Sequence, residues 1–435
     1  MKSEGKRAAP GFRFKDAKRR SQFGGMVNAK DGRKVMLSRR SFLKSSAAAA
    51  AVGVSAGRAR ADTSGVTDTE IKIGQTMPYS GPASAYGVIG RTEAAYFKMI
   101  NTEGGVNGRT IKLISLDDGY SPPKTVEQVR RLVEQEQVAF LFNTLGTPSN
   151  AAIRQYCNDN KIPQLFVATG AAMFSDPKHF PWTMGWQPNY QTEAKIFAQH
   201  ILKTKPDAKI AALYQNDAFG KDYLIGLKDG LGDHAGMVIK EASYETSEPT
   251  VDSQIVMLQG SGADVFLIAA TPKFAAQAIR KAFDIGWTPA RYMTDVSQSI
   301  ASVMKPAGPD KSKGVITAVY GKDPTDGRWK DDPGFKEYAA FVAKYMSPSD
   351  LIDSNAVYGF GAAATMVQVL KQCGHDLSRE NVMRQAANLK DFELPMLLPG
   401  IKVNTSLDNY SPIRQEALAA FNGASWEQFG ELFMG

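Results

Sequence analysis

The feature that most constrains the fold is a regular alternation of short apolar runs with amphipathic stretches, beginning near residue 71. The apolar runs start at residues 71, 110, 138, 164, 209, 237, 264 and 291 and read IKIGQ, TIKLISLDD, VAFLF, QLFVAT, KIAALY, MVIKEASY, DVFLIAA and RYMTD. Short apolar runs bounded by turn residues are typical of buried strands. Between them apolar residues recur at spacings of three and four, which predicts helices. Strands that alternate with helices predict parallel sheets covered on both faces.

Two such series follow one another, and they predict an α/β protein with two doubly wound lobes of four or five strands each. A segment rich in proline and aromatic residues, FPWTMGWQPNYQ, separates them at residues 180–191. A multi-strand hinge is expected between the lobes, because the chain returns to each of them. The predicted boundaries are 69–187 for the N-terminal lobe, completed by 320–395, and 188–319 for the C-terminal lobe, completed by 396–435.

The predicted helices differ in how deeply they should be buried. RTEAAYFKMINTEGG, from residue 91, has one apolar face and should end at Gly104 and Gly105. NAVYGFGAAATMVQVLKQC, from residue 355, is apolar on most faces and should lie deep in the protein.

The segment SRRSFLK at residues 38–44 has the sequence pattern of a twin-arginine export signal, with Arg39 and Arg40 as the arginine pair. A short apolar run follows, and then the small-residue sequence from Ala59 to Ala61, where cleavage is expected. The apolar run is too short to span a bilayer, which needs about 20 residues. The chain is therefore expected to use the twin-arginine export machinery and to reach the periplasm.

Residues 1–61 are interpreted as an N-terminal extension followed by this signal peptide. Translation could start at Met1, Met26 or Met36, and residues 1–35 are expected to play no part in the fold. Residues 62–435 carry 36 basic and 41 acidic side chains, so the basic balance of the full chain comes from the leader alone. No basic stripe with interleaved aromatic residues remains, and a nucleic-acid partner is not expected.

Sites for catalysis or for metals are not apparent. The motifs GxxxxGK[ST], GxGxxG after the first strand, HExxH and GxSxG are missing, so no enzymatic activity, catalytic residue or cofactor is expected. The four histidines have no metal-ligand spacing, and no metal is expected. Cys157 and Cys373 are either two buried thiols, the preferred interpretation, or a periplasmic disulfide.

In open α/β sheets, ligands bind beyond the carboxyl ends of the strands. Thr147 and Pro148 follow one strand there, and Thr271 and Pro272 follow another. Threonine as a helix N-cap with proline in the first turn explains both pairs structurally. A helix start also suits a carboxylate, because its N–H groups are free and its dipole end is positive. Together with the turns that hold Thr169 and Phe219, these residues predict a cleft lined by hydroxyls and rings.

The stretch from IKIGQTMPYSGPASAYG to VRRLVEQEQVAFLF resembles the N-terminal lobe of branched-chain amino-acid-type solute-binding proteins of ABC importers. The specific elements are SGP, INxxGGVNGR and NDxFGK in this order, and the resemblance covers most of residues 62–435. It implies the periplasmic binding protein type I fold and a monomer. The implied ligand is a branched-chain or other hydrophobic amino acid, or an aromatic acid, delivered to an inner-membrane ABC permease. A periplasmic sensor, an amide- or urea-binding protein and an exported enzyme are the alternatives.

The resemblance also implies roles for single residues. Tyr86 would pack on the ligand side chain, Thr147 would hold its α-carboxylate, and Phe219 would close over it. The family's acidic position, which binds the α-amino group, falls on Val296 in an ungapped match, next to Asp295. The expected ligand-binding residues are Tyr86, Thr147, Ala168, Thr169, Gly170, Phe219, Thr271, Asp295 and Tyr320.

Overall fold

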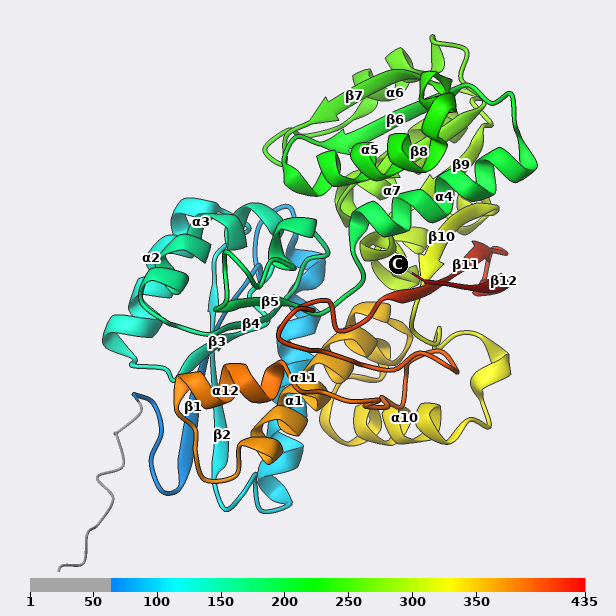
Figure 1. Ribbon diagram of the computed structural model, residues 1–435. Helices are drawn as coiled ribbons and strands as arrows, with labels where there is room; N and C mark the ends of the chain where they lie inside the picture. Colours follow the sequence, from blue (N-terminus) through cyan, green and yellow to red (C-terminus); the bar gives the residue numbers. More distant parts are fainter. Residues whose placement is uncertain (1–63, 435) are drawn as a thin grey trace, which may run out of the picture. The chain divides into compact units, whose positions relative to one another are not determined.

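The computed structural model describes residues 64–434, so the export signal with Arg39, Arg40, Ala59 and Ala61 lies outside the described residues. The first sheet has five parallel strands in the order β2-β1-β3-β4-β5 (Figure 1). Its strands are β1 (Glu70–Met77), β2 (Thr110–Asp117), β3 (Phe140–Phe142), β4 (Gln164–Val167) and β5 (Thr183–Gly185). β3 and β4 are buried along their whole length, as expected of inner strands of a parallel sheet.

Six helices accompany this sheet, and three of them come from the C-terminal third of the chain. They are α1 (Gly87–Thr102), α2 (Pro122–Arg130), α3 (Thr147–Asp159), α10 (Pro333–Tyr345), α11 (Ser354–Cys373) and α12 (Arg379–Ala386). α11 packs against α1 and α12, and 15 of its 20 residues are buried, which confirms the prediction for this segment. α1 ends before Gly104 and Gly105, which both have positive φ, also as predicted.

The second sheet has the strand order β12-β11-β10-β9-β8-β6-β7. Its strands are β6 (Ile210–Gln215), β7 (Val238–Tyr244), β8 (Val265–Ala269), β9 (Ala290–Met293), β10 (Val315–Val319), β11 (Gln415–Phe421) and β12 (Trp426–Met434). The strands from β6 to β10 are parallel, whereas β11 and β12 are antiparallel to their neighbours. The helices here are α4 (Tyr190–Thr204), α5 (Ala218–Leu231), α6 (Asp252–Gln259) and α7 (Pro272–Asp284), with the short α8 (Lys305–Ala307) and α9 (Pro309–Ser312).

The expectation of four or five strands was wrong for the second sheet, which has seven. β5, β10, β11 and β12 were not among the predicted strands. β12 forms a half-exposed hairpin arm, and β11 joins β10 only after the chain has passed through α10, α11 and α12. Such long-range pairing leaves no periodic signal in the local sequence.

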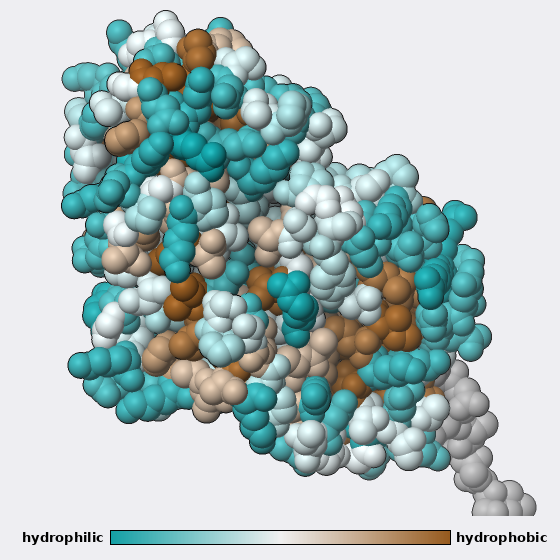
Figure 2. Space-filling model, turned by 180° about the vertical axis from the view of Figure 1, so that it is seen from behind, coloured by the Kyte–Doolittle hydropathy of each residue, from teal (hydrophilic) through white to brown (hydrophobic). Residues whose placement is uncertain are grey.

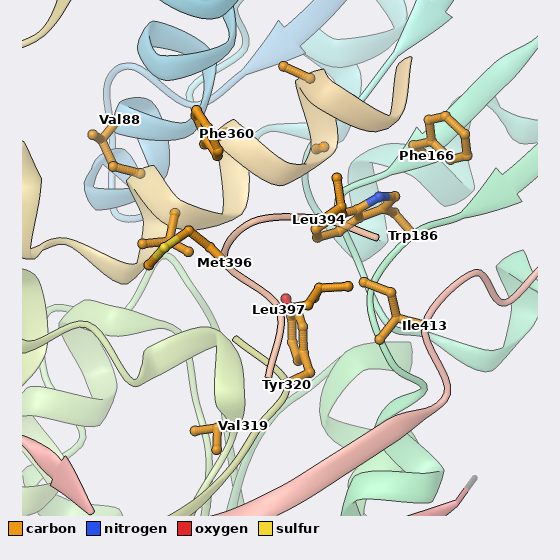
Figure 3. Packing of buried hydrophobic residues seen from close by; sticks show 14 of the residues in the cluster. Val88, Phe166, Trp186, Val319, Tyr320, Phe360, Leu394, Met396, Leu397 and Ile413 are labelled. Atoms are coloured by element: carbon orange, nitrogen blue, oxygen red, sulfur yellow. The ribbon is translucent and has the colours of Figure 1, made fainter. Parts of the chain in front are cut away.

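The chain passes between the two sheets three times: after β5, after β10 and before β11. Figure 3 shows residues from all three passages packed together, among them Trp186, Tyr320 and Ile413. The rings of Trp186 and Tyr320 lie 6.2 Å apart, and the Trp186 Nε1–H donates to Thr365 Oγ1 of α11 at 3.0 Å. A buried apolar cluster therefore holds the crossing segments together.

The face shown in Figure 2 carries hydrophilic side chains around its edges, with groups of hydrophobic residues between them. No helix among the described residues has the length and apolar character needed to cross a membrane. Cys157 and Cys373 are both buried as free thiols.

Candidate ligand-binding site

A pocket lies where the carboxyl ends of strands from both sheets face one another, and it encloses about 590 Å³ of empty volume, part of it open to solvent. This size suits a small-molecule ligand. Seven of its lining residues were predicted and follow strand ends: Tyr86, Thr147 and Ala168 on the first-sheet side, and Phe219, Thr271, Asp295 and Tyr320 on the second-sheet side.

The start of α3 forms one wall of the pocket. The prediction that Thr147 is the N-cap was wrong, because Gly146 is the N-cap residue and Thr147 is the first residue of α3. Gly146 has φ 101°, and a Cβ there would lie 2.6 Å from the ring of Tyr120, so only glycine fits. The Thr147 hydroxyl makes no capping bond but lies 2.6 Å from Thr169 Oγ1. This wall therefore presents a hydroxyl and a helix N-terminus to the pocket.

Thr271 occupies the corresponding position on the second sheet. It is the N-cap residue of α7, as predicted, but its side chain makes no capping hydrogen bond. Its hydroxyl instead lies 3.2 Å from the Tyr244 hydroxyl, which also accepts the Thr271 N–H at 3.0 Å. The Tyr244 hydroxyl donates to Gln215 Oε1 at 3.1 Å. The hydroxyl of Thr271 is thus held in place by a buried polar network.

Aromatic side chains dominate the rest of the lining. Phe219 lies at the start of α5, where Asp217 accepts its N–H at 2.9 Å, and its ring packs 5.1 Å from that of Tyr190. Tyr86, Tyr120, Tyr320 and Tyr358 also line the pocket, and burial raises the pKa of each well above 10. Their hydroxyls therefore remain protonated and can donate hydrogen bonds inside the pocket.

Asp295 is the acidic residue of the pocket. It is 4% exposed, and burial raises its pKa to about 6. Its neighbour Val296 also lines the pocket, and the Val296 carbonyl accepts the Tyr86 hydroxyl at 3.1 Å. An acidic side chain is thus present although the ungapped match placed valine at this position. The lining contains no lysine, arginine or histidine.

Thr169 and Gly170 lie just behind the lining. Thr169 contacts the pocket residue Thr147 through the hydroxyl pair described above. A Cβ on Gly170 would lie 2.2 Å from the Pro188 carbonyl oxygen and 2.8 Å from the ring of Tyr190. Gly170 therefore allows the first passage between the sheets to pack closely against the turn after β4.

Some lining residues were missed by the sequence analysis: Tyr120, Gln187, Tyr190, Gln298, Asn355 and Tyr358. Tyr120 follows β2, so the strand-end rule could have identified it. Asn355 and Tyr358 belong to α11, far along the chain from the strands of the first sheet, and only tertiary packing brings them to the pocket.

A second pocket, here called the inner pocket, adjoins the first and shares Gln298, Tyr320, Ser354 and Tyr358 with it. Its other walls are mostly apolar and include Trp186, Leu394, Met396, Leu397 and Trp426, with Lys322 and Asp323 as the charged members. Several of these residues appear around Tyr320 in Figure 3. The two pockets together offer room for an apolar group larger than an aliphatic side chain.

Comparisons with known proteins agree with this architecture. The sequence model of the periplasmic binding protein family matches residues 70–421, and that of the twin-arginine translocation signal matches residues 36–56. A relative from Brucella suis, Leu/Ile/Val-binding protein homolog 7, is 23% identical over 82% of this chain and 89% of its own.

Solved structures share the fold. A branched-chain amino acid ABC transporter protein from Thermus thermophilus with bound valine has a TM-score of 0.77 at 16% identity, covering 85% of this chain and 98% of its own. A fatty acid ABC transporter substrate-binding protein from Thermomonospora curvata has a TM-score of 0.72 at 22% identity, covering 86% of this chain and 94% of its own.

The family match spans the first sheet, the second sheet as far as β11 and the strand-end turns that line the pocket, and the signal match spans the arginine pair. The chain belongs to the periplasmic binding protein family and is exported to the periplasm.

Proposed function

We propose that this protein is the receptor of an ABC importer and delivers a small carboxylate-bearing solute to the membrane permease. The solute would be a branched-chain or other hydrophobic amino acid, or an aromatic acid. The observation that carries this proposal is the wall formed by the start of α3 and the Thr147 hydroxyl, opposite a set of aromatic rings.

The carboxylate would bind at the α3 wall. The lining of the first pocket has no cationic side chain. The groups there that can bind an anion are the helix dipole, the first N–H groups of α3 and the neighbouring hydroxyls. Hydrogen bonds to a charged group in a buried site are stronger than neutral ones.

The rest of the ligand would be apolar. Phe219, Tyr190 and Tyr320 offer ring faces and edges, and the inner pocket extends the space beyond Tyr320. A small aliphatic amino acid would fill the first pocket alone, whereas an aromatic or longer acid would reach the inner pocket. The related protein from Thermomonospora curvata, named for fatty acids, makes longer acids a useful part of any ligand screen.

Transport would depend on closure of two lobes around the ligand. We take the first sheet with its helices as one lobe and the second sheet with its helices as the other. Residues 396–412, expected in the second lobe, pack on the first, where the Thr405 hydroxyl donates to the Ala386 carbonyl and the Tyr410 hydroxyl to the Pro181 carbonyl. Contacts that the ligand makes only in the closed form shift the population toward that form. Moving a receptor from mostly open to mostly closed takes about 5.5 kcal/mol of such preference.

Isothermal titration calorimetry with a matched ligand panel tests the proposal. The panel holds leucine, phenylalanine, phenylacetate, octanoate and the amides of the same compounds. At least one acid should bind and raise the melting temperature with the logarithm of its excess over Kd, while its amide should bind at least tenfold more weakly. Binding of the amides as tightly as the acids would contradict a carboxylate site.

A further inference from the structure

Three carboxylates from distant parts of the chain converge behind the wall of the ligand pocket. Glu193 lies in the first turn of α4, Asp295 follows β9, and Glu416 lies on β11. One carboxylate oxygen from each lies within 4.8 Å of the other two. The three residues are 1%, 4% and 0% exposed, so water does not screen their charges.

No basic side chain balances this cluster. The salt bridges of the described residues include none that involves Glu193, Asp295 or Glu416. Burial and then mutual repulsion raise the pKa of Glu193 and Glu416 well above 4.5. Three buried negative charges without a compensating positive charge would cost several kcal/mol each.

The hydrogen bonds of the cluster are distributed unevenly. Glu193 accepts the Asp295 N–H at 2.8 Å and the hydroxyl of Tyr223. Asp295 accepts a long contact of 3.5 Å from the Thr294 hydroxyl, and its carboxyl group also has side-chain hydrogen bonds with Glu193 and Tyr223. Glu416 is fully buried, and neither of its carboxylate oxygens has a hydrogen-bond partner among the described residues. A buried carboxylate without a hydrogen-bond partner is rare in proteins. Both oxygens of Glu416 are in this state within the cluster.

We propose that Glu193, Asp295 and Glu416 form a binding site for a calcium ion behind the ligand pocket. The three oxygens lie within 4.8 Å of one another, so an ion equidistant from them would lie no more than about 2.8 Å from each, within reach of calcium–oxygen distances of about 2.3–2.6 Å. Magnesium usually keeps several bound waters, for which a cluster of residues that are 0–4% exposed leaves little room. Carboxylate oxygens are the ligands that this class of cation prefers.

Shared protons explain the cluster less well than a cation does. A protonated carboxyl group still needs an acceptor for its O–H. Glu193 and Asp295 can share a proton through their side-chain hydrogen bond, but no hydrogen bond connects Glu416 with either of them. A cation, in contrast, uses all three oxygens at once and supplies the missing positive charge. The sequence offered no such signal, because the three residues are separated by about a hundred positions each.

The ion would stabilise the elements next to the hinge. α4 begins directly after the first passage between the sheets, and β11 directly after the third. Asp295 also lines the ligand pocket, so a bound cation would offset its charge close to an anionic ligand. This last consequence rests on the proposed function, whereas ion binding itself does not.

Ion binding can be tested on the exported protein without any ligand. After treatment with a chelator, addition of Ca²⁺ at a hundredfold excess over its Kd should raise the melting temperature by about 3–6 °C. Mg²⁺ at the same concentration should have a much smaller effect. Tb³⁺, which replaces calcium, should show luminescence sensitised by nearby tyrosines, with one ion per chain by mass spectrometry of the bound metal.

Two variants locate the site. Glu416→Gln should abolish the Ca²⁺-dependent rise and the Tb³⁺ signal, even if it leaves the metal-free protein as stable as before or more so. Glu431→Gln, a change on the exposed face of the neighbouring strand β12, should behave like the unchanged protein. Circular dichroism confirms that each variant is folded.

The outcomes separate the alternatives. Absence of any Ca²⁺ or Tb³⁺ response in the unchanged protein would overturn the proposal without use of a variant. An equal response to Mg²⁺ would overturn the calcium assignment, and a response that persists in Glu416→Gln would overturn the location. If calcium binds but acids do not, the proposed function fails and the ion site stands.

Discussion

At the scale of single residues, the pocket depends on side chains with two roles. Thr147 lines the pocket and pairs with Thr169, while Gly146 gives the start of α3 its direction. Asp295 lines the pocket and belongs to the buried carboxylate cluster. Binding and packing are therefore coupled, and a useful variant is one that removes a single polar group and keeps the shape.

Thr147→Val is such a variant. It should weaken binding of a carboxylate ligand by about 1.5–3 kcal/mol, because a hydrogen bond to a charged group is lost. Thr147→Ser keeps the hydroxyl and should stay within about 0.5 kcal/mol of the unchanged protein. Calorimetry with the tightest acid of the panel measures both, and equal affinity of the valine variant would assign Thr147 to packing alone.

A substitution at Gly170 tests the packing just behind the pocket lining. Gly170→Ala should lower the free energy of unfolding by about 1–3 kcal/mol, because the new Cβ would overlap the Pro188 carbonyl oxygen. Gly236→Ala is the control, since no atom lies within 4 Å of a Cβ there, and it should be neutral or slightly stabilising. Urea unfolding compares the two variants, and equal stabilities would argue against the close approach at Gly170.

At the scale of elements, the turns at strand ends position the residues that line the pocket. A charged side chain stabilises some of these turns. The turn after β2 leads to Tyr120 in the pocket. Asp117, at the end of β2, accepts the N–H groups of Tyr79 at 3.0 Å and Gly119 at 3.0 Å, and the Ser80 hydroxyl at 2.6 Å. It also pairs with Lys124 at 3.1 Å. A single carboxylate thus joins the turns that follow β1 and β2.

These contacts predict a pH dependence of stability. Partial burial alone would raise the pKa of Asp117, but the bonds from Ser80, Lys124 and Gly119 outweigh it and hold the pKa below its ordinary value. A lowered pKa contributes stability above the unfolded-state value of about 3.9, and that contribution is lost as the pH falls further.

Asp117→Asn should therefore lower the free energy of unfolding by about 1–2 kcal/mol at pH 7, with the difference shrinking below about pH 4. The exposed Asp408→Asn is the control and should change stability little at either pH. Denaturant unfolding at pH 7 and pH 3 measures both variants. A deficit for Asp117→Asn that is the same at both pH values would show that the carboxylate charge is not the cause.

At the scale of the whole molecule, two sheets face each other at the carboxyl ends of their parallel strands, and three chain passages connect them. Hydrogen bonds also join the two sides directly: the Tyr86 hydroxyl donates to the Val296 carbonyl at 3.1 Å, and Gln215 Nε2 donates to the Tyr120 hydroxyl at 3.3 Å. Such bonds are made only when the two sides are close, so in the proposed closure mechanism they would contribute to the closed form.

Tyr86→Phe should favour the open form by about 0.5–1.5 kcal/mol, because it removes one of these bonds and keeps the ring. Small-angle scattering should show a larger radius of gyration for the ligand-free variant, and saturating ligand should restore the compact value. Tyr79→Phe removes a hydroxyl that contacts Ser115 within the first-sheet side, and it should not change the radius. If the ligand-free Tyr86→Phe variant and the unchanged protein scatter identically, this bond does not contribute to closure.

Local patterns in the chain were enough to predict much of this protein. Eight apolar runs became strands, α11 was expected to be buried, and seven predicted residues came together in one pocket. These features follow from periodicity, turn residues and the rule that ligands bind at strand ends, all of which act over short stretches of chain.

Other features depend on long-range contacts. The pairing of β11 with β10, the contribution of Tyr358 to the pocket and the meeting of Glu193, Asp295 and Glu416 join segments far apart in the chain. The amino-acid sequence by itself determined the two series of strands and helices, because burial and hydrogen bonding select them locally. Only the tertiary structure decided which side chains share one buried space, because that depends on how three passages of the chain cross between two sheets.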